Sequence, residues 1–150
     1  MTGSMLRAGL AAILTATLAI GCGPSSDVPR SLEQLSIGQV GQIFHSFQKA
    51  KKPAPKEFAE IQPLLARFPA AVESIRSGDV LVFWGAGIDE GPDAPSTVLA
   101  YQKDVPEKGG EVLMQDGTPR RMTPEEFRDA KKPAGASTEL KLPARGKKKK

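Results

Sequence analysis

Apolar residues recur at helical spacing over the stretch that follows residue 31. The residues that carry the pattern are Leu32, Leu35, Val40, Ile43, Phe44 and Phe47. Most of them are three or four positions apart, which places their side chains on one face of a helix. Lysines gather at the end of the pattern, where they complement the helix dipole, and Pro53 and Pro55 stop it. We predict an amphipathic helix over 32–50, which needs a core to pack on because Gly38 and Gly41 weaken it.

A second helical stretch is interrupted by prolines. Its shared apolar face consists of Phe58, Ile61, Leu64, Leu65 and Phe68, and Pro63 divides it. Pro69 suits the first turn of another short helix over 70–76, and Gly78 suits the position just after its end. We therefore predict two short helical pieces at an angle rather than one rod.

From residue 79 the pattern becomes that of β-strands. Residues 79–85 form an apolar, β-branched and aromatic run bounded by glycines, which predicts a buried central strand. A loop over 86–95 follows, and further strands are predicted over 96–102, 111–115 and 119–122. Pro119 marks the last of these as an edge strand, because proline donates no ladder hydrogen bond. Asp116-Gly117 predicts a type I′ hairpin turn before it.

The last predicted element is a short helix, which Thr123 caps and Pro124 begins. Helices followed by an antiparallel meander predict an α+β fold, with N-terminal amphipathic helices packed on a three- to four-stranded sheet. We assign residues 31–130 to this head domain. Residues 131–150 form a Lys-rich tail, whose composition from 133 onwards predicts disorder.

The first 21 residues have the anatomy of a secretory signal. Arg7 precedes an apolar run over 8–20, about 13 residues long, which fits a signal and falls short of the roughly 20 residues of a membrane span. Translation could start at Met1 or at Met5. Residues 1–21 are therefore predicted to be removed from the mature protein.

The end of this run, Leu18-Ala19-Ile20-Gly21-Cys22, resembles the lipobox of bacterial lipoproteins. The resemblance implies that Cys22 becomes the N-terminus and carries fatty acyl chains such as palmitate, which insert into a membrane. Residues 22–30 would then be a small, polar tether. The alternative is ordinary cleavage after Gly21 or Gly23. Acylation accounts better for the single cysteine of an exported chain, which has no disulfide partner.

A broader resemblance covers residues 36–128. Ser77-Gly78-Asp79-Val80, Val98-Leu99-Ala100-Tyr101 and the segment 110–117 are similar to segments of small exported lipoproteins of unassigned function. The order of elements also resembles the heads of pilin-like and pseudopilin proteins, which implies a helix lying across a small antiparallel sheet. A pilin keeps its apolar N-terminal helix, whereas the apolar run here ends at Cys22 and is predicted to be lost.

Charge is divided unevenly along the chain. Residues 22–130 hold 12 Lys and Arg against 16 Asp and Glu, whereas residues 131–150 hold 8 Lys and Arg against one Glu. The head is therefore mildly acidic, which argues against a basic face for specific nucleic-acid binding. The basic tail is either a solubilising segment or a contact for anionic lipid or envelope polymer.

Few residues indicate chemistry. One cysteine and one histidine exclude a disulfide scaffold and a Cys/His zinc cluster, and we expect no cofactor. The carboxylates of Asp89, Glu90 and Asp93 either hold calcium or belong to a solvated loop. The aromatic rings of Trp84 and Tyr101 either form a ligand-stacking platform or pack in the core. His45, the only histidine, lacks a partner at a spacing typical of catalysis and is expected at a partly exposed helix position.

These features predict a non-catalytic lipoprotein of the cell envelope, periplasmic or surface-facing, that binds a protein or polymer partner or has a structural role. The first alternative is a carboxylate-dependent hydrolase that uses Asp89, Glu90 or Asp93. The second is a pseudopilin-like accessory of a secretion machine, which would require the apolar N-terminal segment to be retained.

Overall fold

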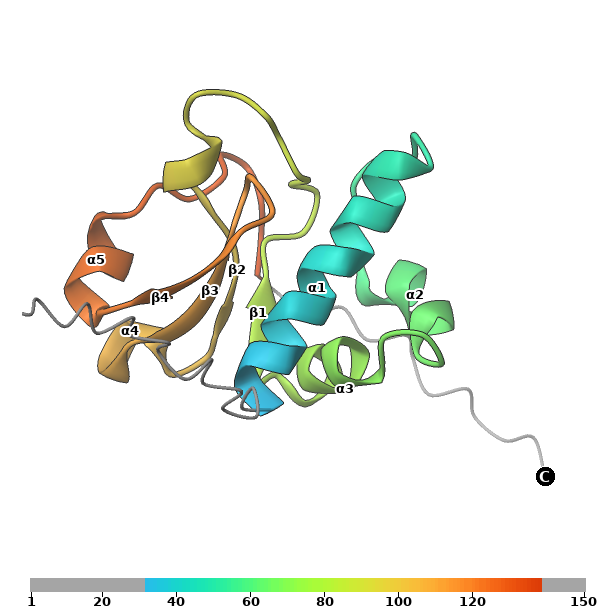
Figure 1. Ribbon diagram of the computed structural model, residues 1–150, viewed down its shortest axis with the longest axis horizontal. Helices are drawn as coiled ribbons and strands as arrows, with labels where there is room; N and C mark the ends of the chain where they lie inside the picture. The colour runs from blue at the N-terminus through green and yellow to red at the C-terminus, as the bar shows by residue number, and fades with distance from the viewer. Residues whose placement is uncertain (1–31, 139–150) are drawn as a thin grey trace, which may run out of the picture.

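A computed structural model describes residues 32–138 (Figure 1). Its helices are α1 (Leu32–Lys49), α2 (Phe58–Ile61), α3 (Pro69–Ser77), α4 (Val105–Lys108) and α5 (Pro124–Asp129), with 3₁₀ turns at Gln62–Leu64 and Ala94–Ser96. Strands β1 (Val80–Val82), β2 (Val98–Gln102), β3 (Gly110–Met114) and β4 (Pro119–Met122) form one antiparallel sheet in the order β1-β2-β3-β4. The predicted α+β fold is confirmed.

The predicted signal, tether and lipidation site at Cys22 lie outside the described residues, as does the part of the predicted tail from 139 to 150. Within residues 32–138, no helix has both the length and the apolar content that crossing a membrane requires.

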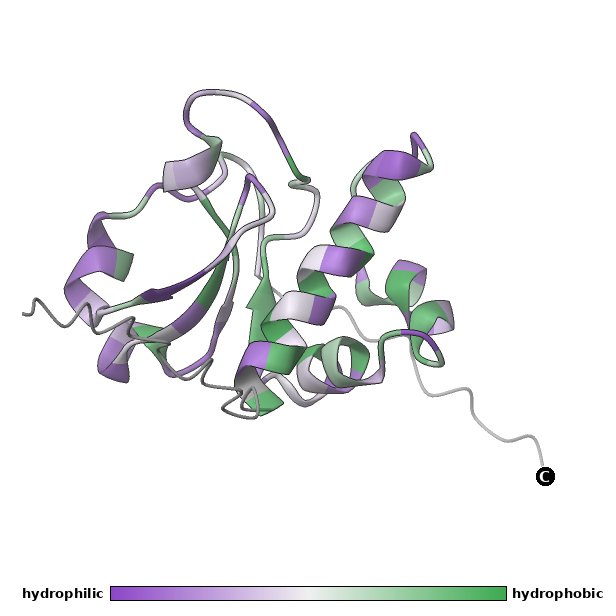
Figure 2. Ribbon diagram, viewed as in Figure 1, coloured by the Kyte–Doolittle hydropathy of each residue, from purple (hydrophilic) through white to green (hydrophobic). Residues whose placement is uncertain are grey.

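Helix α1 lies against one face of the sheet through Val40, Ile43 and Phe44 of the predicted stripe and through Ile37, which the prediction did not include. Leu32 and Leu35, which the prediction placed on the stripe, are instead 81% and 40% exposed. Ile37, Val40, Ile43 and Phe44 are at most 3% exposed and belong to one core cluster with α2, α3 and β1. Figure 2 shows hydrophobic and hydrophilic residues alternating along α1. A helix with two interior glycines is intrinsically weak, so the burial of this stripe supplies most of its stability.

The opposite face of the sheet carries a second apolar cluster, which α4 and α5 cover. It contains Val98, Val112, Met114 and Phe127. Strand β2 contains a bulge, because Val98 pairs with Met114 while Ala100 pairs with Leu113. The extra residue, Leu99, lets Leu99 and Ala100 both join the cluster of α1, whereas Val98 joins the other. The sheet therefore divides two cores.

Two predicted helix ends are confirmed. Gly78 follows α3 with a φ of 80°, and its N–H donates to the carbonyls of Ile75 and Ser74. Thr123 caps α5 in a complete capping box, in which its hydroxyl accepts from the N–H of Glu126 at 3.2 Å and its own N–H donates to the Glu126 carboxylate at 2.8 Å.

The prediction of a buried central strand over 79–85 is wrong in its place and length. Strand β1 covers only Val80–Val82 and lies at the edge of the sheet, paired with β2 alone. Val80 and Val82 are nevertheless at most 2% exposed, because they pack in the cluster that α1 and α3 share. An apolar run predicts that a strand is buried but does not predict its position in the sheet, because helices can bury an edge strand as effectively as neighbouring strands do.

The predicted type I′ turn is also wrong. Gly117 has a φ of 85°, but Asp116 is not among the residues with positive φ, which a type I′ turn requires at both central positions. The loop has three residues, because the N–H of Gly117 donates to Met114 at 3.0 Å and that of Met114 donates to Thr118 at 2.9 Å. Asp116 Oδ1 accepts from the N–H and the hydroxyl of Thr118, at 2.9 and 2.6 Å, which holds this wider loop.

The head domain extends beyond its predicted end at residue 130. The N–H of Lys131 donates to Ser96 at 3.0 Å, and the N–H of Val98 donates to Lys131 at 2.9 Å. Further along, the N–H of Trp84 donates to Ser137 at 2.9 Å. Residues 131–138, which the sequence assigns to the tail, therefore belong to the fold. Backbone hydrogen bonds hold this segment, and Ala136 packs against the cluster of α1.

Candidate functional site

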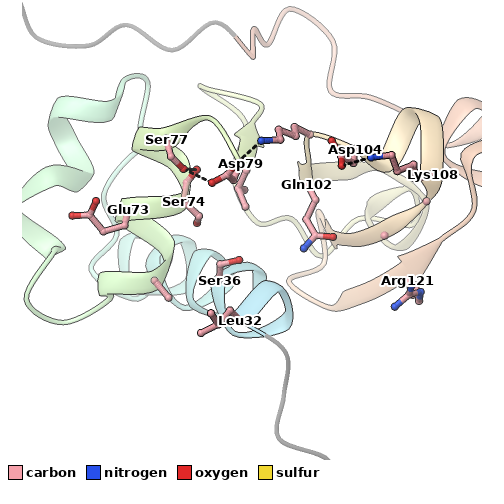
Figure 3. A pocket seen from close by; sticks show the side chains of 15 residues that line it. Leu32, Ser36, Glu73, Ser74, Ser77, Asp79, Gln102, Asp104, Lys108 and Arg121 are labelled. Atoms are coloured by element: carbon pink, nitrogen blue, oxygen red, sulfur yellow. Dashed lines mark hydrogen bonds and ion pairs between the residues drawn. The ribbon is translucent and has the colours of Figure 1, made fainter.

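A cleft opens at the end of the sheet where α1 begins. Its volume is about 810 Å³, and it lies between the first turn of α1, the end of α3 and the ends of β2 and β4. Figure 3 shows Leu32 and Ser36 of α1 beside Ser77, Asp79, Gln102 and Arg121. Elements distant in the sequence therefore meet at one cleft.

Asp79 stands at the rim of this cleft because Gly78 turns the chain from α3 into β1. Its Oδ2 accepts from the Ser77 hydroxyl at 2.6 Å, and its Oδ1 accepts from the Lys103 ammonium at 2.5 Å. The ammonium of Lys103, and then the hydroxyl of Ser77, lower the pKa of the Asp79 carboxyl. The same hydrogen bond to Asp79 raises the pKa of Lys103. The ionised form of each group is thus favoured.

The other basic residues of the cleft are also paired. Lys108 contacts Asp104 at 3.0 Å within α4, and this contact raises the pKa of Lys108. Arg121 lies 3.8 Å from Glu111, directly across the ladder between β3 and β4. The positive charges that line the cleft are therefore balanced by carboxylates.

Glu111 is the one buried charged residue in the part of the chain that the structure describes, with an exposure of 7%. Its Oε1 lies 3.5 Å from Gln34 Nε2 at the start of α1, in addition to the contact with Arg121. Its backbone N–H donates to Gln102 Oε1 at 2.8 Å. These contacts tie β3 to α1, β2 and β4 beside the cleft. The carboxylate needs such partners, because a buried charge without them is costly.

The two aromatic residues predicted as a possible platform lie on opposite faces of the sheet. Trp84 is 7% exposed in the cluster of α1. Tyr101 packs against the other cluster, with ring centroids 5.8 Å from Phe83 and 4.7 Å from Phe127. Burial raises the pKa of Tyr101, which a hydrogen bond with Thr138 partly offsets. The structure therefore does not bring the two rings together as a platform, and both rings pack against core residues, the other alternative that the sequence left open.

The carboxylates of Asp89, Glu90 and Asp93, in the loop over 86–95, do not lie together. Asp89 Oδ1 accepts from the N–H of Glu90 at 2.8 Å and from that of Gly91 at 3.2 Å. Asp93 pairs with Lys131 at 2.5 Å, and Glu90 is exposed. Among residues 32–138, no group of three or more His, Cys, Asp or Glu side chains could hold a metal ion. The structure therefore does not bring Asp89, Glu90 and Asp93 together, and it adds no support to calcium binding by residues 86–95.

His45 is exposed on α1, away from the cleft. A side chain on Gly117 would meet its Nε2 at 2.6 Å, so the hairpin loop packs closely on the imidazole ring. The exposed helix position expected for His45 agrees with the structure.

Sequence reasoning did not find the cleft. Its polar residues come from separate elements and form no motif of fixed spacing. The available signals were Gly78 and the pair Gly109-Gly110, which mark the turns that bring these elements to one end of the sheet.

Comparison with known proteins adds no relative: the sequence matches no protein-family model, no curated protein and no solved structure. The geometry of the cleft and the residues themselves therefore carry the functional argument.

Proposed function

We propose that the protein is a lipid-anchored, non-catalytic binding protein of the cell envelope, which presents its cleft to a partner close to the membrane. The observation that carries the proposal is the lipobox-like sequence ending at Cys22, the only cysteine, a short distance before the first residue of α1. Residues 22–31 span at most about 35 Å when extended, so a lipid at Cys22 would hold the head near the membrane surface.

The cleft favours binding over proton transfer. A general acid or base works best with a pKa near the operating pH. The contact between Lys103 and Asp79 moves both pKa values away from neutrality, downward for the carboxyl and upward for the ammonium. Both groups therefore stay ionised at pH 7 and serve as fixed hydrogen-bonding partners.

The balanced charge of the cleft suits an uncharged polar segment of a partner, such as a peptide backbone or a glycan. Ser74, Ser77 and Gln102 supply hydroxyl and amide groups, and Leu32 and Ala70 supply apolar surface. Binding sites typically combine apolar surface with a few polar groups in this way.

Site-specific crosslinking in the native membrane tests the proposal. A photoreactive residue in place of Ser77, at the cleft, is compared with one in place of Arg128, in the last turn of α5. We expect a reproducible adduct from position 77 only, and its loss with the Cys22→Ser variant, which would release the head from the membrane. Equal adducts from both positions, or turnover of an envelope substrate by the purified protein, would contradict the proposal.

A further inference from the structure

A second groove lies along the C-terminal half of α1, away from the cleft. Its volume is about 550 Å³, and its lining includes Gln42, His45, Ser46 and Lys49 of α1 together with Arg67 and Phe68. Helix α1 has 18 residues and is about 27 Å long, so the groove and the cleft lie toward opposite ends of it (Figure 1). The two sites are therefore separate surfaces.

The groove differs from the cleft in its charge. Lys49 and Arg67 line it, and Lys51 and Lys52 follow in the turn after α1; all four are exposed. None of the four forms an ion pair within residues 32–138, whereas the bases of the cleft are paired. The groove is thus a concentration of uncompensated positive charge on a head whose net charge is negative.

The donors of the groove are arranged for an anion. The guanidinium carbon of Arg67 lies 5.2 Å from the centroid of the Phe68 ring, a cation–π contact that restrains the side chain and leaves its N–H edges open. The hydroxyl of Ser46 donates to the Ile43 carbonyl at 2.6 Å and is therefore occupied. Lys49, Arg67 and the Gln42 amide remain as donors. Planar guanidinium and ammonium groups together suit phosphate oxygens.

We propose that this basic groove binds a polymer that carries repeated phosphate groups and no nucleobases. One phosphate bears at most about two negative charges, whereas four cations extend from the groove onto the adjacent turn. Charge balance therefore favours a ligand with several anionic groups. Phe68 is buried beneath Arg67, so the imidazole of His45 is the one exposed ring among the residues that line the groove. Proteins that bind single-stranded nucleic acids stack successive bases on several aromatic side chains, so a single ring favours a polymer without bases. The inference does not depend on the lipid anchor or on the cleft.

Binding of poly(glycerol phosphate) to the full-length protein tests this inference. The double variant Lys49→Gln/Arg67→Gln should bind about tenfold more weakly, because each residue loses a charge-assisted hydrogen bond. The matched control is Arg76→Gln/Lys131→Gln, which removes the same charge from two exposed residues that are ion-paired with Glu73 and Asp93. We expect the control to retain wild-type affinity within about twofold, as exposed pairs contribute little.

Backbone amide shifts of the wild-type protein locate the site without any substitution. On addition of the polymer, the largest changes should fall on residues 42–52 and on Arg67. Equal losses of affinity in the two double variants would mean that net charge or the Lys-rich tail binds the polymer, which overturns the proposal. If polyglutamate binds as tightly as poly(glycerol phosphate), the assignment of phosphate as the recognised group is overturned. If a single-stranded oligonucleotide binds more tightly than poly(glycerol phosphate), the proposal that the polymer carries no bases is overturned.

Discussion

Alanine substitutions at Gly38 and Gly41 test how closely α1 lies on the sheet. Both glycines are inside α1, and neither has a positive φ, so an alanine fits the backbone at both positions. Nothing lies within 4 Å of a Cβ added at Gly38, whereas a Cβ at Gly41 would meet Leu113 Cδ1 at 3.2 Å and the Gly117 carbonyl oxygen at 3.6 Å. One substitution therefore tests helix propensity alone, and the other also tests packing.

The Gly38→Ala variant should be more stable than the wild type by about 0.5–1 kcal/mol, which is the helix-propensity gain. That gain corresponds to a rise in Tm of about 4–8 °C per kcal/mol for a domain of roughly this size. The Gly41→Ala variant has the same gain, but overpacking against β3 typically costs about 1–3 kcal/mol. Its free energy of unfolding should fall below that of Gly38→Ala by about 1 kcal/mol or more.

Denaturant unfolding of the two variants, of Leu113→Val and of the Gly41→Ala/Leu113→Val pair gives a double-mutant cycle. Shortening Leu113 removes the atom that the new methyl group meets, so the pair should be more stable than the sum of the single changes predicts. Equal stability of Gly38→Ala and Gly41→Ala, together with zero coupling to Leu113, would refute the close contact between α1 and β3.

Three further changes test local features of the fold. Thr123→Ala removes the capping box of α5 and should lower the free energy of unfolding by about 1 kcal/mol, measured by thermal unfolding. Thr123→Ser keeps the capping hydroxyl and should retain most of the wild-type stability. Gly109→Ala combines a φ of 73° with a Cβ that would lie 2.7 Å from the Met122 carbonyl oxygen, and should cost roughly 2 kcal/mol or more; a neutral result would contradict this turn. Asp79 has a lowered pKa in the folded state, because Lys103 and then Ser77 bind its ionised form, so the unfolded chain takes up the proton first as pH falls. Its contribution is complete above the ordinary carboxyl pKa and is lost as pH falls through the folded-state pKa, so Asp79→Asn should narrow the stability difference between pH 6 and pH 3, most clearly at low salt.

Features encoded within a few residues were predictable from the sequence. The helix over 32–50 corresponds to α1 (Leu32–Lys49), because its apolar spacing and terminal prolines lie within the segment itself. Gly78 and Thr123 end or begin helices as expected, since a left-handed glycine and a capping hydroxyl act on the adjacent turn. Local signals therefore predicted the fold class and most of the elements, whereas the short helix α4 (Val105–Lys108) was not predicted.

Features that depend on distant segments were not predictable. The apolar composition of 79–85 is the same whether strands or helices bury it, so the edge position of β1 had no local signal. Residues 131–138 form backbone hydrogen bonds with Ser96, Val98 and Trp84, and the composition of 131–138 does not predict these bonds. The cleft is lined by residues of α1, α3, α4 and the four strands, so only the fold brings them together.

The intact mass of the protein extracted from its native membranes tests whether Cys22 carries a lipid. We expect a mature species that begins at Cys22 and is heavier than the polypeptide by the mass of its acyl groups. The Cys22→Ser variant should lack this added mass and should leave the membrane fraction. A Ser25→Ala variant, which alters the adjacent tether and keeps the cysteine, should stay acylated. An unmodified species, or one that keeps residues 1–21, would contradict the anchor.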